Sequence, residues 1–376
     1  MRKLIILMVL CFELAMAKVT WYGYYEFEAD HAKSPAADIL FNYNKFRLDF
    51  DTNPTKNIHI GGDIVYKMYG GKTTMNIRSF LDKSFYTGYP KAVVDQMNFE
   101  FSDSLFFDNL FMDFHHQYFE LTLGRQQLPT GVGYAWNPTD IFNKKDIMDP
   151  TYENPGVDAI QLNIPVGSKL SLRGIVQPED SRDNSRQFIE AKTWLPFADL
   201  SLIYGRTKFN NRQRTKDLYG MTMEGDFFGI GFRTEVTANR LDYDNDNLKY
   251  EYIIGADYTF ENSLYILTEY LYNDFGAKTA QTTIMDYLAY YDWQQKSLNK
   301  NYFFMLGMIP VTDLIDGSVM TITNLDDKSI VINPQILYRV YQNVELTIMA
   351  NIFMGEKRDE FGYQELGGRI RLRAYF

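Results

Sequence analysis

The residues most able to do acid–base or metal chemistry are four histidines, His31, His59, His115 and His116. His59 stands four residues before Asp63, and on a strand both would face one side, which makes them the only local candidate for a hydrolytic pair. His115 and His116 are adjacent and would face opposite sides of a strand, so we expect no shared metal ion. The sequence has no G-x-S-x-G, H-E-x-x-H or glycine-rich phosphate loop, and we expect neither catalytic residues nor a cofactor.

A cluster of aspartates, Asp242, Asp244 and Asp246, is similar to a weak calcium-binding loop. It lacks the glycine and the distal glutamate that such a loop needs at fixed spacing. We therefore favour a solvated loop, or loose divalent contact with lipopolysaccharide, over a dedicated metal site.

The residues at the C-terminus are of types that could select ions. The last nine residues, Gly368-Arg369-Ile370-Arg371-Leu372-Arg373-Ala374-Tyr375-Phe376, alternate strictly between polar and apolar side chains. On a strand this places three arginines on one face and the apolar residues on the other. In a soluble sandwich the apolar face would meet a core, whereas in a membrane barrel it meets lipid and the arginines face a water-filled lumen. A basic stripe in a lumen could guide anions, or nearby carboxylates could neutralise it, and both interpretations stay open.

The same alternation predicts lumen charges on other strands. The predicted cations are Lys45, Arg47, Lys67, Arg173, Lys192 and Arg233 with the three C-terminal arginines, and the predicted anions are Asp49, Asp63, Glu190, Asp257 and Glu345. A barrel closes when its last strand pairs with its first, and the simplest antiparallel register puts Glu26 near Arg369. That register also puts Tyr24 near Arg371 and Tyr22 near Arg373, which predicts a salt bridge and cation–π stacking on the lumen wall.

The elements that must position these charges are alternating segments of about 9–12 residues, the length of a tilted strand across a bilayer. Short turns separate them in alternation with longer polar loops, which we place near 29–39, 178–186, 208–217, 239–248, 273–299 and 355–362. Both termini should lie on the periplasmic side, which requires an even strand number. We assign residues 70–106 to one long extracellular region with room for its own hairpin. The result is about 18 strands, with about 16 as the alternative.

Aromatic side chains near strand ends are expected to form girdles at the lipid boundary. The residues assigned to these girdles are Trp21, Tyr22, Tyr204, Tyr250, Tyr252, Tyr258, Tyr270, Tyr272, Phe303 and Phe304. Ordinary β-propensity would also enrich strands in aromatic residues, so the girdle is an interpretation of the set rather than of any single residue.

The N-terminus has the three parts of a secretory signal: a basic start at Arg2 and Lys3, an apolar stretch and an Ala15-Met16-Ala17 cleavage site. We therefore divide the chain into a signal peptide, residues 1–17, and an outer-membrane barrel, residues 18–376. Removing residues 1–17 takes away Cys11, the single cysteine, and with it any disulfide. A formal net charge of −10 argues against nucleic-acid binding.

Residues 127–156 are the expected constriction loop, between a strand at 119–126 and a strand at 157–165. Four prolines prevent a regular strand ladder there, yet the loop carries large apolar side chains that need a packing surface. The inside of the barrel offers that surface, and the loop would narrow the pore or brace the wall. Tyr134 and Trp136 could stack on a sugar. The remaining candidate site residues of this segment are Arg125, Asp140, Lys144 and Lys145.

Two segments of the sequence, the last strand and the part that contains G-R-Q and N-P-T-D, resemble segments of known families of bacterial proteins. An amphipathic last strand ending on Phe376 resembles the C-terminal signature of outer-membrane barrels, which implies recognition by the barrel-assembly machinery. The segment 124–158, which contains G-R-Q (124–126) and N-P-T-D (137–140), resembles the G-R-Q…N-P-x-D segment of porin-like outer-membrane proteins, including alginate-export-type barrels. Its likeness covers about 35 residues and implies a porin-like barrel rather than a particular solute.

The sequence thus predicts an all-β transmembrane antiparallel barrel with an inward-folded loop. We expect a channel for passive diffusion of small hydrophilic, anionic or saccharide, solutes, and no enzyme. A barrel lipase or protease, and a structural or adhesin barrel, are the alternatives. The expected partners are outer-membrane lipid, lipopolysaccharide, the barrel-assembly machinery and a second copy of the chain.

Overall fold

A computed structural model of the chain describes residues 18–91, 98–146, 148–149, 153–179, 184–209, 214–242, 247–276 and 296–376. The expected signal peptide, together with Asp244 and Asp246 of the aspartate cluster, lies outside these residues. Among the described residues, no helix has the length and hydrophobicity that crossing a membrane would require.

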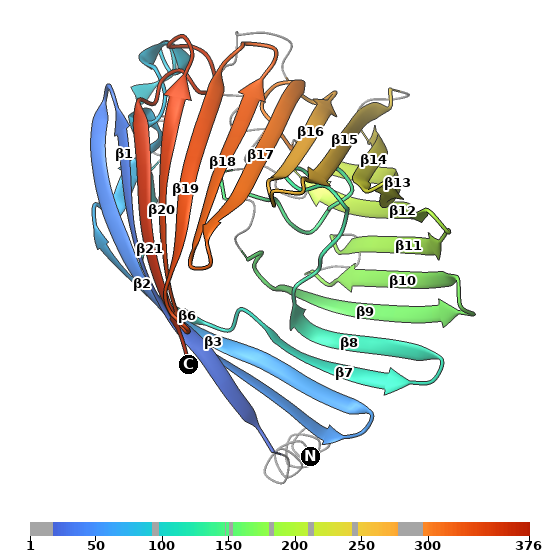
Figure 1. Ribbon diagram of the computed structural model, residues 1–376. Helices are drawn as coiled ribbons and strands as arrows, with labels where there is room; N and C mark the ends of the chain where they lie inside the picture. Colours follow the sequence, from blue (N-terminus) through green and yellow to red (C-terminus); the bar gives the residue numbers. More distant parts are fainter. Residues whose placement is uncertain are drawn as a thin grey trace.

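Eighteen antiparallel strands close into a barrel (Figure 1). They are β1 (Thr20–Ser34), β2 (Ala37–Thr55), β3 (Ile58–Gly71), β7 (Leu110–His116), β8 (Phe119–Gln126), β9 (Val157–Val166), β10 (Leu170–Gln177), β11 (Arg186–Trp194), β12 (Ala198–Phe209), β13 (Arg214–Phe227), β14 (Ile230–Leu241), β15 (Lys249–Thr259), β16 (Tyr265–Asn273), β17 (Asn301–Thr312), β18 (Ile315–Asn324), β19 (Ile330–Tyr341), β20 (Val344–Met354) and β21 (Leu366–Tyr375). Each strand pairs with its neighbours in the sequence, and β1 pairs with β21.

The connection between β3 and β7 contains the hairpin for which the sequence left room. Strands β4 (Thr74–Asn76) and β5 (Asn98–Glu100) pair with each other, and two short 3₁₀ turns lie between them, η1 (Ile77–Ser79) and η2 (Lys83–Phe85). The end of the region behaves differently from the expectation, because β6 (Ser104–Phe106) pairs with β3 and joins the wall. Strands β6 and β7 therefore act as one interrupted strand along β3.

The register of barrel closure differs from the one that the sequence suggested. Arg373 lies opposite Glu26, Arg371 opposite Glu28 and Arg369 opposite Asp30. The predicted register was wrong by four residues. It would have left the carboxylates of Glu28 and Asp30 in the wall without the arginines, and a buried charge without a partner is costly. A cation–π contact does form on the lumen wall, but its partners are Arg373 and the ring of Tyr24, 4.5 Å apart, and not the predicted pairs of Tyr24 with Arg371 and Tyr22 with Arg373.

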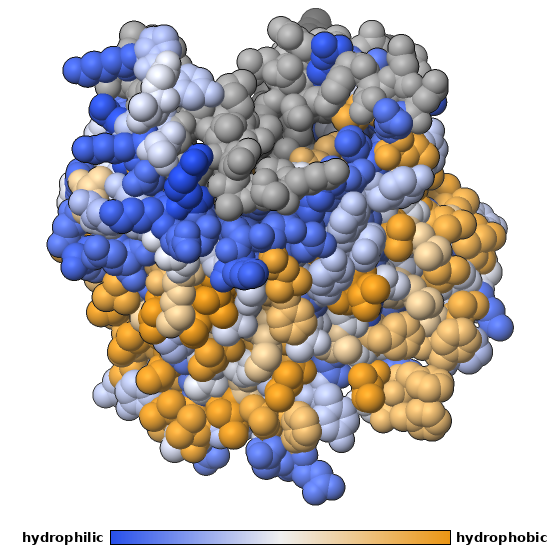
Figure 2. Space-filling view, turned by 90° about the horizontal axis from the view of Figure 1, so that it is seen from above, coloured by the Kyte–Doolittle hydropathy of each residue, from blue (hydrophilic) through white to orange (hydrophobic). Residues whose placement is uncertain are grey.

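Alternation along the strands sorts the two faces of the wall as predicted for a membrane barrel. Exposed apolar residues such as Ile160, Leu162 and Ile164 occupy the outer face, and Figure 2 shows apolar side chains gathered in a band beside a hydrophilic zone. Two residues of the expected girdles were assigned to the wrong face. Phe304 is buried inside the barrel, and Tyr22 lines a hollow of the inner wall beside Arg47.

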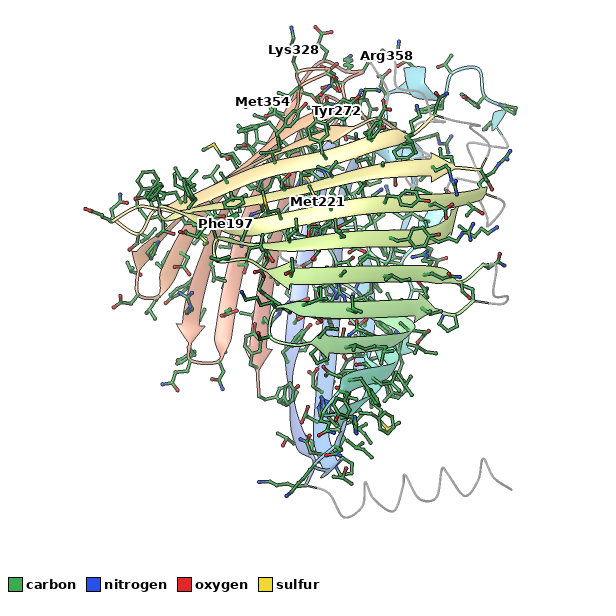
Figure 3. All side chains as sticks on the ribbon, turned by 90° about the vertical axis from the view of Figure 1, so that its right-hand side faces the viewer. Phe197, Met221, Tyr272, Lys328, Met354 and Arg358 are labelled. Carbon is green, nitrogen blue, oxygen red and sulfur yellow. The ribbon has the colours of Figure 1, made fainter. Side chains whose placement is uncertain are left out.

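The connections between strands are short at one end of the barrel and mostly longer at the other end. At the end that holds both termini, hereafter the turn end, connections such as 117–118, 195–197 and 342–343 are short. At the opposite loop end lie the long connections, and Figure 3 labels Lys328 and Arg358 there and Phe197 at the turn end. The loop expected at 29–39 does not exist, because β1 and β2 continue through it and leave only residues 35–36 as a turn.

The closure register predicts a specific cross-link. Phe27 and Leu372 are partners across the β1–β21 seam, and directly opposed residues of antiparallel strands have Cα atoms about 4.5–5.5 Å apart, which is within the range that a disulfide spans. The double variant F27C/L372C, made in a chain that starts at Lys18 and so lacks Cys11, should form an internal disulfide under mild oxidation, detected by mass spectrometry of the joined peptides. The control F27C/G368C tests the register shifted by four residues. Efficient linkage in this control, with none in the first variant, would contradict the observed seam.

Candidate functional site

The described residues of the long connection from β8 to β9, 127–146, 148–149 and 153–156, lie inside the barrel (Figure 1), as the sequence predicts. Its apolar side chains pack on two patches of the inner wall. Leu128, Ile141 and Phe142 join a buried cluster with inward residues of β9 to β13. Ala135 and Trp136 join a second cluster with inward residues of β15 to β19. The loop therefore crosses the lumen and is attached to the wall on both flanks.

Ring contacts define how the loop meets these patches. Trp136 lies 5.8 Å from Tyr302 and 6.2 Å from Phe304 between ring centroids. Phe142 lies 5.8 Å from Phe188. Only 2% of Trp136 is exposed, so its ring cannot stack on a sugar as the sequence suggested. An aromatic side chain in a proline-rich loop can either pack against the protein or stack on a ligand. The residues that surround it in the folded structure determine which of the two occurs.

Two wall carboxylates hold the loop backbone. Glu269 on β16 accepts hydrogen bonds from the backbone N–H groups of Tyr134 (2.7 Å), Ala135 (3.1 Å) and Trp136 (2.9 Å). Glu235 on β14 accepts from the N–H groups of Val132, Gly133 and Thr139 and from the Thr139 hydroxyl. Both glutamates are fully buried, and several donors to one carboxylate offset part of the cost of burying its charge.

The close approach to Glu235 explains a glycine in the loop. Gly131 has a φ of +81°, and a Cβ atom there would come within 2.5 Å of Glu235 Oε1. The backbone at this point thus needs both the left-handed conformation and the missing side chain. The amino-acid sequence by itself does not reveal this reason, because Glu235 lies about 100 residues further along the chain.

Two candidate residues of the loop, Asp140 and Lys145, hold its own backbone, and a third, Lys144, is half-buried. Asp140 Oδ1 accepts from the backbone N–H groups of Phe142 (2.8 Å) and Asn143 (2.9 Å). Lys145 Nζ donates to the carbonyl oxygens of Gly133 (2.7 Å) and Tyr134 (2.8 Å). Burial, assisted by the nearby charge of Lys296, lowers the pKa of Lys144 to about 7.

The other end of the loop reaches the seam between the first and last strands. Asp149 Oδ2 contacts Arg369 Nη1 at 3.0 Å and Arg371 Nη2 at 2.6 Å. One loop carboxylate thus bridges two arginines of the C-terminal stripe. Each of these arginines also contacts a wall carboxylate, Arg369 with Asp30 at 2.6 Å and Arg371 with Glu28 at 2.5 Å.

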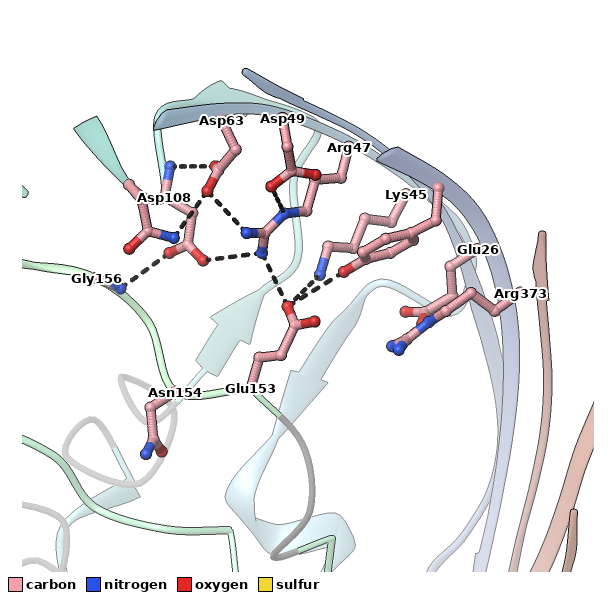
Figure 4. A network of polar contacts seen from close by, with 12 residues as sticks. Glu26, Lys45, Arg47, Asp49, Asp63, Asp108, Glu153, Asn154, Gly156 and Arg373 are labelled. Carbon is pink, nitrogen blue, oxygen red and sulfur yellow. Dashed lines mark hydrogen bonds and ion pairs between the residues drawn. The ribbon is translucent and has the colours of Figure 1, made fainter. Parts of the chain in front are cut away.

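Glu153 makes the second contact between the loop and the basic residues (Figure 4). Its Oε2 atom lies 2.9 Å from Arg47 Nη1 and 3.8 Å from Lys45 Nζ, and it accepts a hydrogen bond of 3.2 Å from the Tyr24 hydroxyl. These three partners come from β1 and β2, so Glu153 occupies a site on the wall that offers two cations and a hydroxyl to a carboxylate.

Arg47 is the centre of this network. Its guanidinium contacts Asp49 (2.9 Å), Asp63 (3.0 Å) and Asp108 (3.8 Å) in addition to Glu153. Asp63 also accepts from the backbone N–H of Asp108 and the side chain of Asn109, which holds the break between β6 and β7 in place. The interrupted strand and the Arg47 network are therefore one structural unit.

The remaining predicted pore residues divide into two groups. Arg173 faces the lumen, pairs with Glu190 at 2.8 Å and donates to the Pro129 carbonyl, and Arg233 pairs with Asp257. Arg125 does not line the pore. It lies opposite Leu110 and Asp158, both exposed on the outer face, because side chains alternate and its neighbour Gln126 points inward.

The proposed hydrolytic pair does not form. The ring nitrogens of His59 contact Asp51 (2.6 Å) and Asp113 (2.8 Å), while Asp63 binds Arg47. Within the described ranges, no group of three or more His, Cys, Asp or Glu side chains is placed to hold a metal ion.

The loop anchors generate a stability prediction. Replacing both anchors, E235Q/E269Q, removes the charge from carboxylates that receive seven hydrogen bonds, and the loop should open more often. We expect a loss of about 1–3 kcal/mol per anchor, and a clear rise in the rate at which a protease cuts within 127–156 in the folded barrel. The control E224Q alters a wall carboxylate whose ion-pair partner among the described residues is Lys192 alone. Equal protease resistance of wild type and double variant would contradict the anchoring role.

Solved structures of other proteins share the fold of this chain. No protein-family model and no curated protein sequence matches the chain. Among solved structures, the chain is similar to OccAB4 of Acinetobacter baumannii, with 10% identity, a TM-score of 0.59 and coverage of 96% of this chain and 98% of that one. It is similar to OccK8 (OprE) of Pseudomonas aeruginosa, with 8% identity, a TM-score of 0.59 and coverage of 96% and 98%. OccK11 (OpdR) of the same organism gives 9% identity, a TM-score of 0.57 and coverage of 96% for both chains. At these identities the likeness establishes the fold alone, and the fold is that of porin-like outer-membrane β-barrels.

Proposed function

We propose that this protein is a channel of the outer membrane through which small hydrophilic solutes diffuse passively. The observation that carries the proposal is the inversion of the wall, with apolar side chains outside and charged side chains inside a closed barrel. Such a wall needs lipid on one side and water on the other. The barrels to which the chain is similar are substrate-specific outer-membrane channels, which supports the same function here.

The chain's route to the membrane belongs to the same proposal. We expect cleavage near Ala17, insertion by the barrel-assembly machinery through the strand that ends on Phe376, and contact with lipopolysaccharide. Self-association is a further expectation, since an apolar outer face suits either lipid or a second copy.

Channel activity has a direct test. The purified mature protein in a planar lipid bilayer should give stepwise single-channel currents, because a lumen lined by charged groups conducts hydrated ions. An electrically silent barrel that still inserts and stays folded would favour the structural or adhesin alternative over transport.

The charges at the seam bear on which solutes pass. In the described network, five cations, Lys45, Arg47, Arg369, Arg371 and Arg373, contact eight carboxylates, Glu26, Glu28, Asp30, Asp49, Asp63, Asp108, Asp149 and Glu153. Three formal negative charges remain when all are ionised. The basic stripe is thus neutralised by wall and loop carboxylates, and we propose that the constriction disfavours anions.

Asp149 and Glu153 are the loop residues on which this selectivity should depend. These two carboxylates reach the cations from the loop, whereas the other six belong to the wall strands or to the break between β6 and β7. The side chain of Glu153 is 35% exposed, and that of Asp149, which is 5% exposed, bridges Arg369 and Arg371. In the double variant D149N/E153Q the stripe should be uncovered, and the chloride-to-potassium permeability ratio should rise about threefold or more at low salt. Reversal potentials across a KCl gradient measure this ratio.

The control for this experiment is D146N, which removes an exposed carboxylate of the same loop that accepts a backbone N–H bond from Met148. We expect D146N to change the ratio less than D149N alone, and D149E to keep the wild-type ratio. An equal shift in D146N and D149N would mean that only the total charge matters, and would contradict the covering role.

A further inference from the structure

Two arginines share one carboxylate on the outer face of the barrel near its loop end. Arg206 on β12 contacts Asp217 Oδ1 through Nε at 3.1 Å, and Arg240 on β14 contacts Asp217 Oδ2 through Nη2 at 2.8 Å. Asp217 lies on β13 between them, directly opposite both in the strand register. The hydroxyl of Tyr204 also donates to Asp217 Oδ1. Both carboxylate oxygens are therefore engaged, and the two guanidinium groups are held at a fixed spacing.

The group of two arginines and one aspartate has a net positive charge, and the exposed side chains on the outer face are those of the arginines. The side chain of Asp217 is only 7% exposed, whereas those of Arg206 and Arg240 are 48% and 59% exposed. A guanidinium has five N–H donors in a planar fork, and each contact with Asp217 uses one of them. The remaining donors can bind a second anion without breaking the existing ion pairs.

An apolar groove of about 550 Å³ begins immediately beside the arginines. It is lined by outward residues of β11 to β15, among them Ile189, Leu202, Tyr204, Tyr219, Met221 and Tyr250. Figure 3 looks onto this wall and labels Met221 near its middle. The rings of Tyr204 and Tyr219 lie 5.5 Å apart at the end of the groove next to the arginines, and tyrosines near strand ends are typical of the level of the lipid head groups.

We propose that this surface is a binding site for lipopolysaccharide, with a phosphate of its lipid A on Arg206 and Arg240 and an acyl chain in the groove. Arginine forks match phosphate oxygens in geometry and charge. The height is suitable, because Arg240 is the penultimate residue of β14 and Arg206 lies three residues before the end of β12. With the loop end facing outward, these positions lie in the outer leaflet, where the phosphorylated lipid is lipopolysaccharide.

Another outward ion pair at the same rim provides a matched comparison. Lys33 contacts Glu365 at 3.2 Å on the β1–β21 side of the barrel, with half of each side chain exposed. One cation faces one carboxylate there, so the pair carries no excess charge, whereas the Arg206–Asp217–Arg240 group does. A site specific for phosphate should therefore depend on the arginines and not on Lys33.

The experiment measures lipid bound to the full mature protein in detergent by native mass spectrometry, with bisphosphorylated lipid A as the probe. R206Q/R240Q should bind lipid A about tenfold more weakly, and each single variant should lose part of the affinity, since charge-assisted hydrogen bonds are removed. K33Q should bind as wild type does. Resistance of the barrel to protease verifies that each variant is folded.

Equal binding by wild type and R206Q/R240Q, or an equal loss in K33Q, would overturn the proposal. Displacement of lipid A by equimolar phosphatidylglycerol would also overturn it, because the site would then be one for anionic lipids in general. A shift to dimers that depends on the arginines but not on lipid A would assign the surface to a second copy. None of these outcomes depends on channel conductance, which tests the proposed transport separately.

Discussion

Closure of the hydrogen-bond ladder is the constraint on which the rest of the structure depends. In hydrocarbon each unpaired backbone N–H or C=O costs several kcal/mol, so a sheet can span a bilayer only when it has no free edge. The pairing of β1 with β21 removes the last edge, and the mutual hydrogen bonds between Gly23 and Phe376 bring the seam to the final residue. The chain end is therefore part of the wall.

The inward loop follows from a second requirement, since the interior of a wide barrel must be filled with water or with protein. Here a proline-rich segment crosses the lumen, and its apolar side chains replace water on two patches of the wall. Its backbone cannot form a strand ladder, so Glu235 and Glu269 supply the acceptors that a neighbouring strand would otherwise provide. Acidic residues facing a packed interior thus have a structural role that is separate from ion conduction.

The seam shows how a barrel holds many charges at close range. Arg369, Arg371 and Arg373 each face a carboxylate of β1, and Asp149 bridges two of them from the loop. Removing one member of such a network leaves its partners buried without compensation, which costs more than the pair contributes. Closure of the wall, position of the loop and charge of the constriction are consequently linked through the same side chains.

The sequence alone determined the fold class and the side of the wall that most residues face, because a period of two and the alternation of short turns with longer loops are local properties. It predicted about 18 strands with about 16 as the alternative, and the structure decided between them. It also predicted that residues 127–156 lie inside, since Trp136, Ile141 and Phe142 required a packing surface. Position near a strand end misplaced Phe304 and Tyr22 among the girdle residues, whereas alternation with Phe303 and Trp21 puts both on the inner face. In addition, β1 and β2 continued through the loop expected at 29–39.

The tertiary structure decided the features that depend on strand register and on residues far apart in the sequence, namely the pairing of charges at the seam and the contacts between the loop and the wall. The seam differed from the simplest register because a shift of four residues preserves the alternation and alters only which charges meet. The sequence could not reveal that Glu269 would bind the backbone of Tyr134 or that Glu153 would cover Arg47, since these contacts join residues more than 100 positions apart. Local spacing contains no information about such pairs, and only closure of the barrel brings them together.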